Sequence, residues 1–294
     1  MSNTYGGLIN RPSALQPDTG STYTGVWALH EHHEQRKEGK FGGSNPYSGI
    51  NYLSTTVLHL VPGTIGDTQI IDGTGNCEIY QAADQQKTLG EFYTTADYLS
   101  VYYSAEQVKY GPTSMRFSPS SSCTILYNNK LDLSTGDWTI EWWEYTMWSD
   151  YGCIVRLGLP GSYASIMIGL AVNADYYRSY ISTNANAWAV NAVTMGTGSW
   201  NQWTHYAMTR DTSGGLVRTY QNGYLKSITA LSGATPIYWA KQNYTIHPPY
   251  PANGVDALAD GYVEDFCISK RDKYIPPGKA LVGDYIFAPS RITQ

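Results

Sequence analysis

Short segments with the composition of β-strands recur at a regular pace from about residue 50 to residue 270 of this 294-residue chain. Val, Ile, Thr and aromatic residues fill these segments, and clusters of Gly, Pro, Asn, Asp and Ser separate them. No part of the stretch alternates strands with long helical patterns, which argues against a parallel α/β sheet. Strands and turns at this spacing predict an all-β sandwich or barrel.

The pattern predicts strands of four to ten residues across this stretch, and Asn222-Gly223 between two of them favours a tight hairpin because both residues tolerate positive φ. The predicted strands are residues 55–61, 69–72, 114–117, 123–127, 138–147, 154–159, 165–172, 177–182, 203–210, 216–221, 224–228 and 262–269.

The strand that begins at residue 138 carries the clearest alternation. Trp138, Ile140 and Trp142 fall on one face because successive strand side chains point to opposite sides of a sheet. One face must be core, and Trp143 lies on the other. This predicts that the second face is covered as well.

The composition excludes several functional classes. Charged residues make up 15% of the chain, and the net charge of −5 comes without a basic cluster, so no nucleic-acid partner is expected. No apolar stretch has the length of a membrane span. The first residues lack a signal-peptide pattern, so we expect synthesis in a cytoplasm. The four cysteines form no CxxC pair and are expected to be reduced, buried thiols.

Residues 1–47 differ from the rest and predict an arm with one short helix. Residues 24–38 are the helix candidate, with Thr24 as its cap and Gly39 at its end. Such a short helix with few apolar residues needs a partner surface. The residues expected to provide that contact, by docking or by oligomerisation, are Val26, Trp27, Leu29 and His33.

The order of motifs resembles the laminin-G-like, concanavalin A-like jelly-roll domains. Residues 131–143 read LDLSTGDWTIEWW, and about 60 residues later residues 200–211 read WNQWTHYAMTRD. Residues 215–224 and 261–270, GLVRTYQNGY and GYVEDFCISK, are similar to the family's hairpin and closing strand. The resemblance covers roughly residues 50–280. It implies an all-β sandwich in residues 48–280, followed by a C-terminal tail in residues 281–294.

The arm ahead of such a jelly roll resembles virion proteins of bacteriophages. This resemblance implies a structural or attachment protein of a tail fibre, neck or capsid fibre, made in the host cytoplasm and located in the virion. Its expected partners are other virion proteins, held through the arm, and a host-surface glycan. A homo-oligomer is expected, and a trimer is favoured because fibres are usually built so.

No enzymatic activity is expected. Glycosidases on such sandwiches place two carboxylates across the scissile bond. Glu141 and Glu144 lie three apart in a strand and therefore point to opposite faces unless a bulge intervenes. The alternative is a glycan-cleaving depolymerase that uses Glu141.

No cofactor is expected, although calcium at Asp256 and Asp260 near Asn253 stays an alternative. The run from His30 to Glu34 does not fit a zinc protease, because Glu34 occupies the place of the second His.

A long stretch from residue 233 to residue 260 is the expected ligand-binding loop, because Tyr and Trp side chains stack on sugars or on protein partners. The alternative, equally weighted, is that this loop packs on its own sandwich or on a neighbouring subunit. The predicted ligand-binding residues are Tyr238, Trp239, Tyr244 and Tyr250, with Trp188 from a separate turn.

Overall fold

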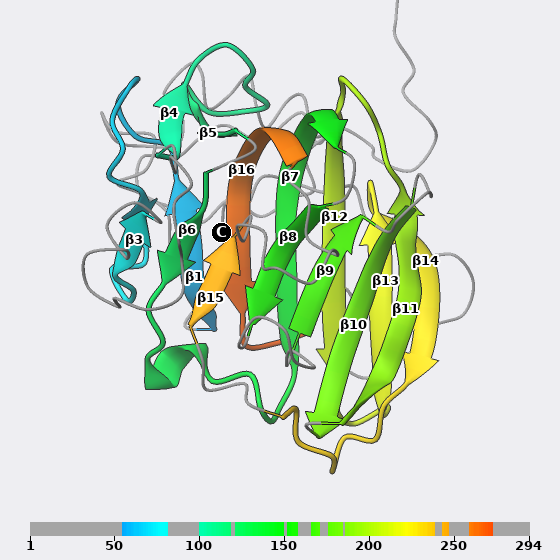
Figure 1. The fold of residues 1–294 in the computed structure, drawn as a ribbon. Coiled ribbons are helices and arrows are strands. Elements are labelled where there is room, and N and C mark those ends of the chain that lie inside the picture. Colours follow the sequence, from blue (N-terminus) through cyan, green and yellow to red (C-terminus); the bar gives the residue numbers. More distant parts are fainter. Residues whose placement is uncertain are drawn as a thin grey trace, which may run out of the picture. The chain divides into compact units, whose positions relative to one another are not determined.

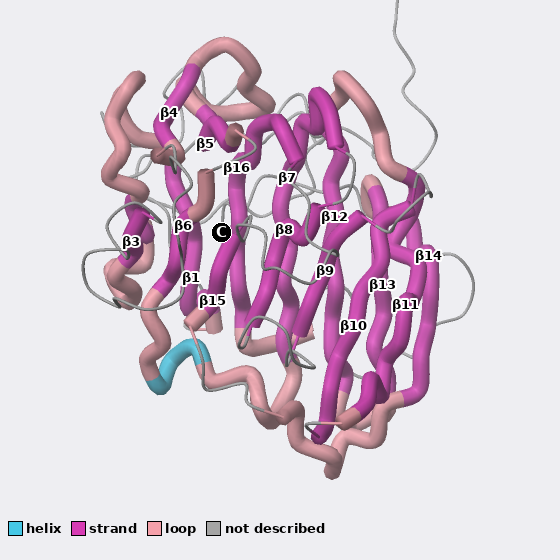
Figure 2. The backbone as a smooth tube through the Cα atoms, in the orientation of Figure 1, coloured by secondary structure: helices cyan, strands magenta, loops and turns pink. Residues whose placement is uncertain are grey.

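The fold is known from a computed structural model, which describes residues 55–81, 100–118, 121–149, 152–157, 166–170, 176–184, 186–238, 243–246 and 259–272. In this part of the chain, two antiparallel sheets pack face to face (Figure 1). One short 3-10 helix, Asn129–Leu131, is the single helical element among the described residues (Figure 2). The predicted all-β jelly-roll sandwich is confirmed.

The nine-stranded sheet has the order β14-β13-β12-β7-β16-β1-β2, with β5 paired to β16 and β4 paired to β5. The closing strand β16 therefore lies between β7 and the opening strand β1. The strands are β1 (Thr56–Val61), β2 (Ile71–Asp72), β4 (Tyr102–Ser104), β5 (Ser114–Phe117), β7 (Trp138–Ser149), β12 (Trp203–Asp211), β13 (Leu216–Gln221), β14 (Tyr224–Ala230) and β16 (Ala259–Ser269).

The seven-stranded sheet has the order β11-β10-β9-β8-β15-β6-β3 and lies in front of the other sheet in Figure 1. Its strands are β3 (Ile79–Gln81), β6 (Cys123–Ile125), β8 (Gly152–Leu157), β9 (Ile166–Leu170), β10 (Tyr176–Asn184), β11 (Ala187–Thr197) and β15 (Tyr244–Ile246).

All twelve predicted strands overlap an observed strand. The hairpin at Asn222-Gly223 joins β13 to β14 with φ of 50° and 82°, as a two-residue turn of this type requires. Strands β3, β4, β11 and β15 were missed. β11 is rich in Ala, Asn and Gly, which have low strand propensity, and its pairing with β10 carries several register shifts.

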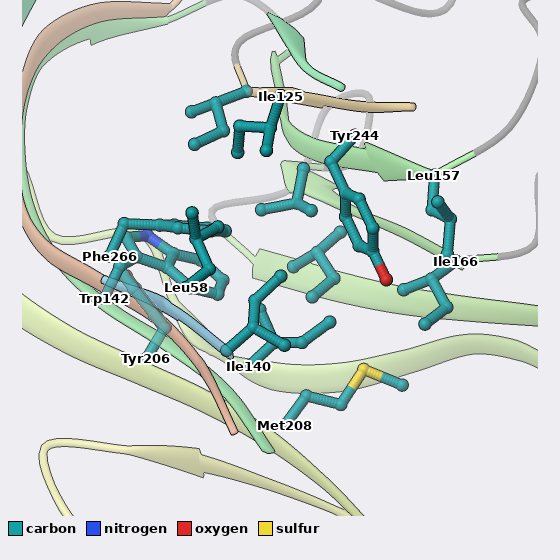
Figure 3. Close-up of a cluster of buried hydrophobic side chains, with 14 of the residues drawn as sticks. Leu58, Ile125, Ile140, Trp142, Leu157, Ile166, Tyr206, Met208, Tyr244 and Phe266 are labelled. Atoms are coloured by element: carbon teal, nitrogen blue, oxygen red, sulfur yellow. The ribbon is translucent and has the colours of Figure 1, made fainter. Parts of the chain in front are cut away.

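Side chains from the facing surfaces of both sheets fill the core (Figure 3). As predicted, Trp138, Ile140 and Trp142 all point inward and have no solvent exposure. The ring of Trp142 lies 5.7 Å from that of Tyr206 and 6.3 Å from that of Phe266, measured between centroids. Aromatic rings from three adjacent strands therefore pack together beneath the second sheet.

The opposite face of β7 is also covered, as predicted. Trp143 is only 5% exposed. The ring of Tyr110 meets it edge-on at 5.4 Å, and Nζ of Lys109 lies 4.4 Å from the ring centroid. The connection between β4 and β5 thus packs over this face.

A carboxyl group, that of Glu144, lies inside the sandwich. It accepts hydrogen bonds from Nε1 of Trp142 (3.1 Å), from Oγ1 of Thr146 (2.7 Å) and from the hydroxyl of Tyr177 on the opposite sheet. Burial raises the pKa of Glu144 above its ordinary value, and the three hydrogen bonds offset this only in part.

The arm with its predicted helix, the predicted domain limits at residues 47/48 and 280/281, and the predicted C-terminal tail lie outside the described residues.

Two isoleucines on the nine-stranded sheet allow a matched test of the core. Ile140 has no solvent exposure, whereas Ile228 is 50% exposed. We expect Ile140→Ala to lower the free energy of unfolding by about 2–5 kcal/mol through lost burial and the cavity it leaves. Ile228→Ala should change it by less than ~1 kcal/mol. Urea denaturation of both variants measures this, and equal losses would contradict the assigned core.

Stability should also depend on the protonation of Glu144. Because its pKa is higher in the folded chain, the folded state keeps the proton more tightly, and the free energy of unfolding falls as pH rises above the ordinary carboxyl range. We expect Glu144→Gln to flatten this decline, which for one proton is at most about 1.4 kcal/mol per pH unit. Glu78→Gln, at an exposed position, is the control. Identical slopes of denaturation stability against pH in Glu144→Gln and the wild type would disprove the assignment.

Candidate functional site

The outer face of strands β1, β16 and β7 in the nine-stranded sheet carries a closed polar layer. The carboxylate of Glu264 accepts hydrogen bonds from the backbone N–H groups of residues 109–111 at 2.6–2.9 Å. His59 and Asp265 lie 3.2 Å apart, and their side chains are each 1% exposed. Burial and the neighbouring Asp265 raise the pKa of Glu264 to about 7. These groups are bound to the protein itself and are shielded from ligands.

The two carboxylates considered for glycan cleavage lie on opposite faces of β7, as their spacing predicts. Glu141 belongs to the closed polar layer, where Oε2 lies 3.6 Å from Nε2 of His205. Glu144 points into the core. The two groups therefore cannot flank one glycosidic bond.

The outer face of the seven-stranded sheet is different, because a row of side chains crosses six neighbouring strands there. In each of these strands, the residues before and after the row residue point into the core. For example, Tyr244 and Ile246, which flank Thr245, are both fully buried. The register partners that form the row are, from β3 to β10, Tyr80, Thr124, Thr245, Arg156, Met167 and Tyr180.

Trp188 on β11 extends this row. Its ring centroid lies 5.2 Å from that of Tyr180, at an interplanar angle of 53°. A register shift between β10 and β11 makes Trp188 the partner of Ser182 while Val190 pairs with Ile181 in the core. Residues two apart in a regular strand point to the same face. The register shift changes this, so Trp188 points outward while Val190 points into the core.

Strand β10 presents three large side chains on the outer face. Tyr176 is 45% exposed, and Arg178 and Tyr180 are half-buried. Tyr177, which lies between Tyr176 and Arg178, and Ile181, which follows Tyr180, are buried in the core. Arg178 pairs with Gly169 of β9, which carries no side chain. Together with Trp188, these residues form what we call the β10 platform: Tyr176, Arg178, Tyr180 and Trp188.

The structure places two of the predicted ligand-binding residues near one another. The backbone N–H of Tyr238 donates to the carbonyl of Ser182 (2.9 Å), the register partner of Trp188. Both aromatic side chains are half-buried. Trp239 and Tyr250 lie outside the described residues.

Tyr244 requires a correction. It belongs to β15, is fully buried between the sheets, and donates a hydrogen bond from its hydroxyl to the carbonyl of Leu131 (2.8 Å). The long predicted loop therefore contains a core strand, and the ring of Tyr244 is not accessible to a ligand.

Tyr176, Arg178 and Tyr180 were missed as site residues. The alternation in Tyr176-Tyr177-Arg178-Ser179-Tyr180 was visible in the sequence, but it did not tell which face is the outer one.

The predicted anchoring residues Val26, Trp27, Leu29 and His33 lie outside the described part of the chain. Of the calcium candidates, Asp260 forms an ion pair with Arg116, and Asn253 and Asp256 are not described. No group of three or more His, Cys, Asp or Glu side chains with metal-binding geometry occurs among the described residues.

Cys77, Cys123 and Cys267 are free thiols, and Cys153 has no described side chain. Burial raises the pKa of the Cys123 thiol to about 12. A search of the described helices found none with the length and apolar character needed to cross a membrane.

Comparison with solved structures shows the same fold in a neurotoxin and in two binding domains. Botulinum neurotoxin type C, whose cell entry is dependent upon interaction with two ganglioside molecules, matches with a TM-score of 0.54 at 14% identity, over 74% of this chain and 48% of that chain. The binding domain of botulinum neurotoxin DC in complex with rat synaptotagmin II matches with a TM-score of 0.52 at 15% identity, over 74% of this chain and 48% of that chain. The binding domain of Paraclostridial Mosquitocidal Protein 1 matches with a TM-score of 0.52 at 14% identity, over 74% of this chain and 49% of that chain.

The chain thus spans about half the length of these structures, and at this identity the likeness concerns the fold. No curated protein matches the sequence. Residues 120–272, just over half of the chain, match the family Laminin_G_3, described as the concanavalin A-like lectin/glucanases superfamily. They include β7, β12, β13 and the closing strand β16, which carry the motifs of the resemblance. The chain therefore belongs to the concanavalin A-like lectin/glucanases superfamily.

Proposed function

We propose that this chain is a structural and attachment component of a bacteriophage particle, and that its lectin-like sandwich binds a host-surface glycan through the β10 platform. The observation that carries the binding role is the pair formed by Tyr180 and Trp188 on the outer face of the seven-stranded sheet. Tyr and Trp rings combine a large apolar face with a polar edge, which suits the apolar faces and the hydroxyl groups of sugars.

Three further points support a binding module over an enzyme. The fold neighbours named above include two binding domains, one of them in complex with rat synaptotagmin II. Glu141 and Glu144 lie on opposite faces of β7. Both are engaged by neighbouring side chains of the sandwich.

The placement in a phage particle rests on the sequence resemblance of residues 1–47 to virion-anchoring arms. In this proposal the arm fastens the sandwich to other virion proteins, and several copies, as a trimer, present their platforms together. Weak contacts of single sandwiches then add up to firm attachment, because the second and third contacts form at a high effective concentration.

The platform is tested by exchanging one tryptophan at a time. We expect Trp188→Ala to weaken binding to host cells or to a bound glycan about tenfold or more, since buried aromatic anchors at interfaces often contribute ~2 kcal/mol. Trp200→Ala is the matched control, because Trp200 is 39% exposed and lies between β11 and β12, away from the Tyr180 pair. Equal effects of the two substitutions on glycan-array or cell binding would rule out the platform.

The arm is tested separately. Deletion of residues 1–47 should abolish incorporation into particles and leave glycan binding by the purified protein intact. Trp188→Ala should do the reverse. Quantification of the protein in purified particles measures the first effect. Incorporation that persists without the arm would refute the anchoring role.

The depolymerase alternative predicts a different result. Purified protein would shorten host polysaccharide, and Glu141→Gln would stop this. Such a result would overturn the non-enzymatic proposal.

A further inference from the structure

The two sheets differ in charge in a way that bears on the ligand. The seven strands of the smaller sheet contain two arginines, Arg156 and Arg178, and no Asp, Glu, Lys or His. The strands of the nine-stranded sheet contain seven acidic residues: Asp72, Glu141, Glu144, Asp211, Asp260, Glu264 and Asp265. A chain of net charge −5 thus carries a sheet whose strands are purely cationic.

The arginines of the nine-stranded sheet are held by the protein. Arg116 pairs with Asp260, and Arg218 lies 3.0 Å from Asp211 and 3.1 Å from Asp272. Arg210 donates to the carbonyl oxygens of Ser134 (3.1 Å) and Thr235 (2.6 Å). These guanidinium groups serve the fold.

Arg178 is different. Within the described ranges, no carboxylate lies at ion-pair distance from its guanidinium. Its side chain is half-buried on the outer face, between Tyr176 and Tyr180 on the same strand. Each of these tyrosines is two residues away, or roughly 6.6 Å along the strand. Its partner on β9 is Gly169.

We infer that the β10 platform recognises an acidic glycan, with Tyr180 and Trp188 stacking on a sugar ring and Arg178 binding the carboxylate of a uronic or sialic acid. This inference rests on the proposed binding function and adds the charge of the ligand to it. A guanidinium presents two parallel N–H donors that match the two oxygens of a carboxylate. None of the seven strands carries an acidic residue, so the strands themselves present no carboxylate that would repel an anionic chain.

The test uses the full-length chain and polygalacturonate, with its fully methyl-esterified form as the neutral counterpart. Polysialic acid serves as a second carboxylate polymer. The variants are Arg178→Gln and Lys226→Gln. Lys226 is exposed on β14 of the other sheet, so both substitutions remove one positive charge from the chain. Biolayer interferometry at fixed salt gives the affinities.

We expect the wild type to bind at least one acidic polymer. Its affinity for the methyl ester should be lower than for polygalacturonate by about tenfold or more. Arg178→Gln should reduce binding of the acidic polymer about tenfold or more, because hydrogen bonds to charged groups are the stronger ones. Lys226→Gln should change it less than twofold. Trp188→Ala should weaken binding of both the acidic and the esterified polymer.

Three results would overturn the inference: equal binding of the acidic and esterified polymers, equal losses in the two charge variants, or binding of neither carboxylate polymer. Arg178-dependent binding of duplex DNA as tight as that of the glycan would also overturn it, in favour of general polyanion binding. If Trp188→Ala abolishes host binding while Arg178→Gln does not, the acidic ligand is wrong and the proposed function stands. If neither variant affects host binding, the platform itself is wrong.

Discussion

Strand β7 runs through the middle of the nine-stranded sheet, and Ile140 and Trp142 pack against the second sheet with no exposure to solvent. Every other feature depends on this burial between the sheets. The aromatic rings of Trp142, Tyr206 and Phe266 come from three adjacent strands, so their packing holds β12, β7 and β16 in one register. A shift of one residue in any of these strands would turn its apolar side chains to the outer face.

Because the core uses one face of each sheet, the two outer faces are free to differ. On the nine-stranded sheet, carboxylates, histidines and arginines are buried and bind one another or backbone N–H groups. Such a layer satisfies buried polar groups and offers a ligand little. On the seven-stranded sheet, Tyr176 is exposed on the outer face, and Arg178, Tyr180 and Trp188 are half-buried there. The sandwich is shared by many proteins, and the outer surface of a sheet is where this chain would acquire its own specificity.

The carboxyl of Glu144 shows that the core also contains polar contacts between the layers. It receives hydrogen bonds from Trp142 and Thr146 on its own strand and from Tyr177 on the opposite sheet. Tyr177 in turn stacks on Tyr206 at 4.2 Å, so the same tyrosine joins a polar and an aromatic contact. Hydrogen bonds of this kind have directions, and they fix how the two sheets are aligned more closely than apolar packing does.

The sequence by itself determined the fold class and most of the strand positions along the chain. β5, β7, β13 and the hairpin at Asn222-Gly223 carry their signals locally, in alternating apolar residues and in turn residues with defined φ. It did not determine β11, whose Ala- and Asn-rich strand is held by its pairing with β10, nor β15, which lies within a Pro-rich stretch. For the same reason the sequence pattern predicts a ligand contact at Tyr244, although its ring packs in the core.

The site was decided only by the tertiary structure. Alternation divides the residues of β10 into two sets, but a period of two is the same whichever set faces the core. The pairing of β10 with β9 and β11 brings Tyr180, Arg178 and Trp188 to one outer face, and these contacts join segments that are separated in the sequence. Local propensity holds no information about such pairings, because they are fixed by the burial of the opposite face across the whole sheet.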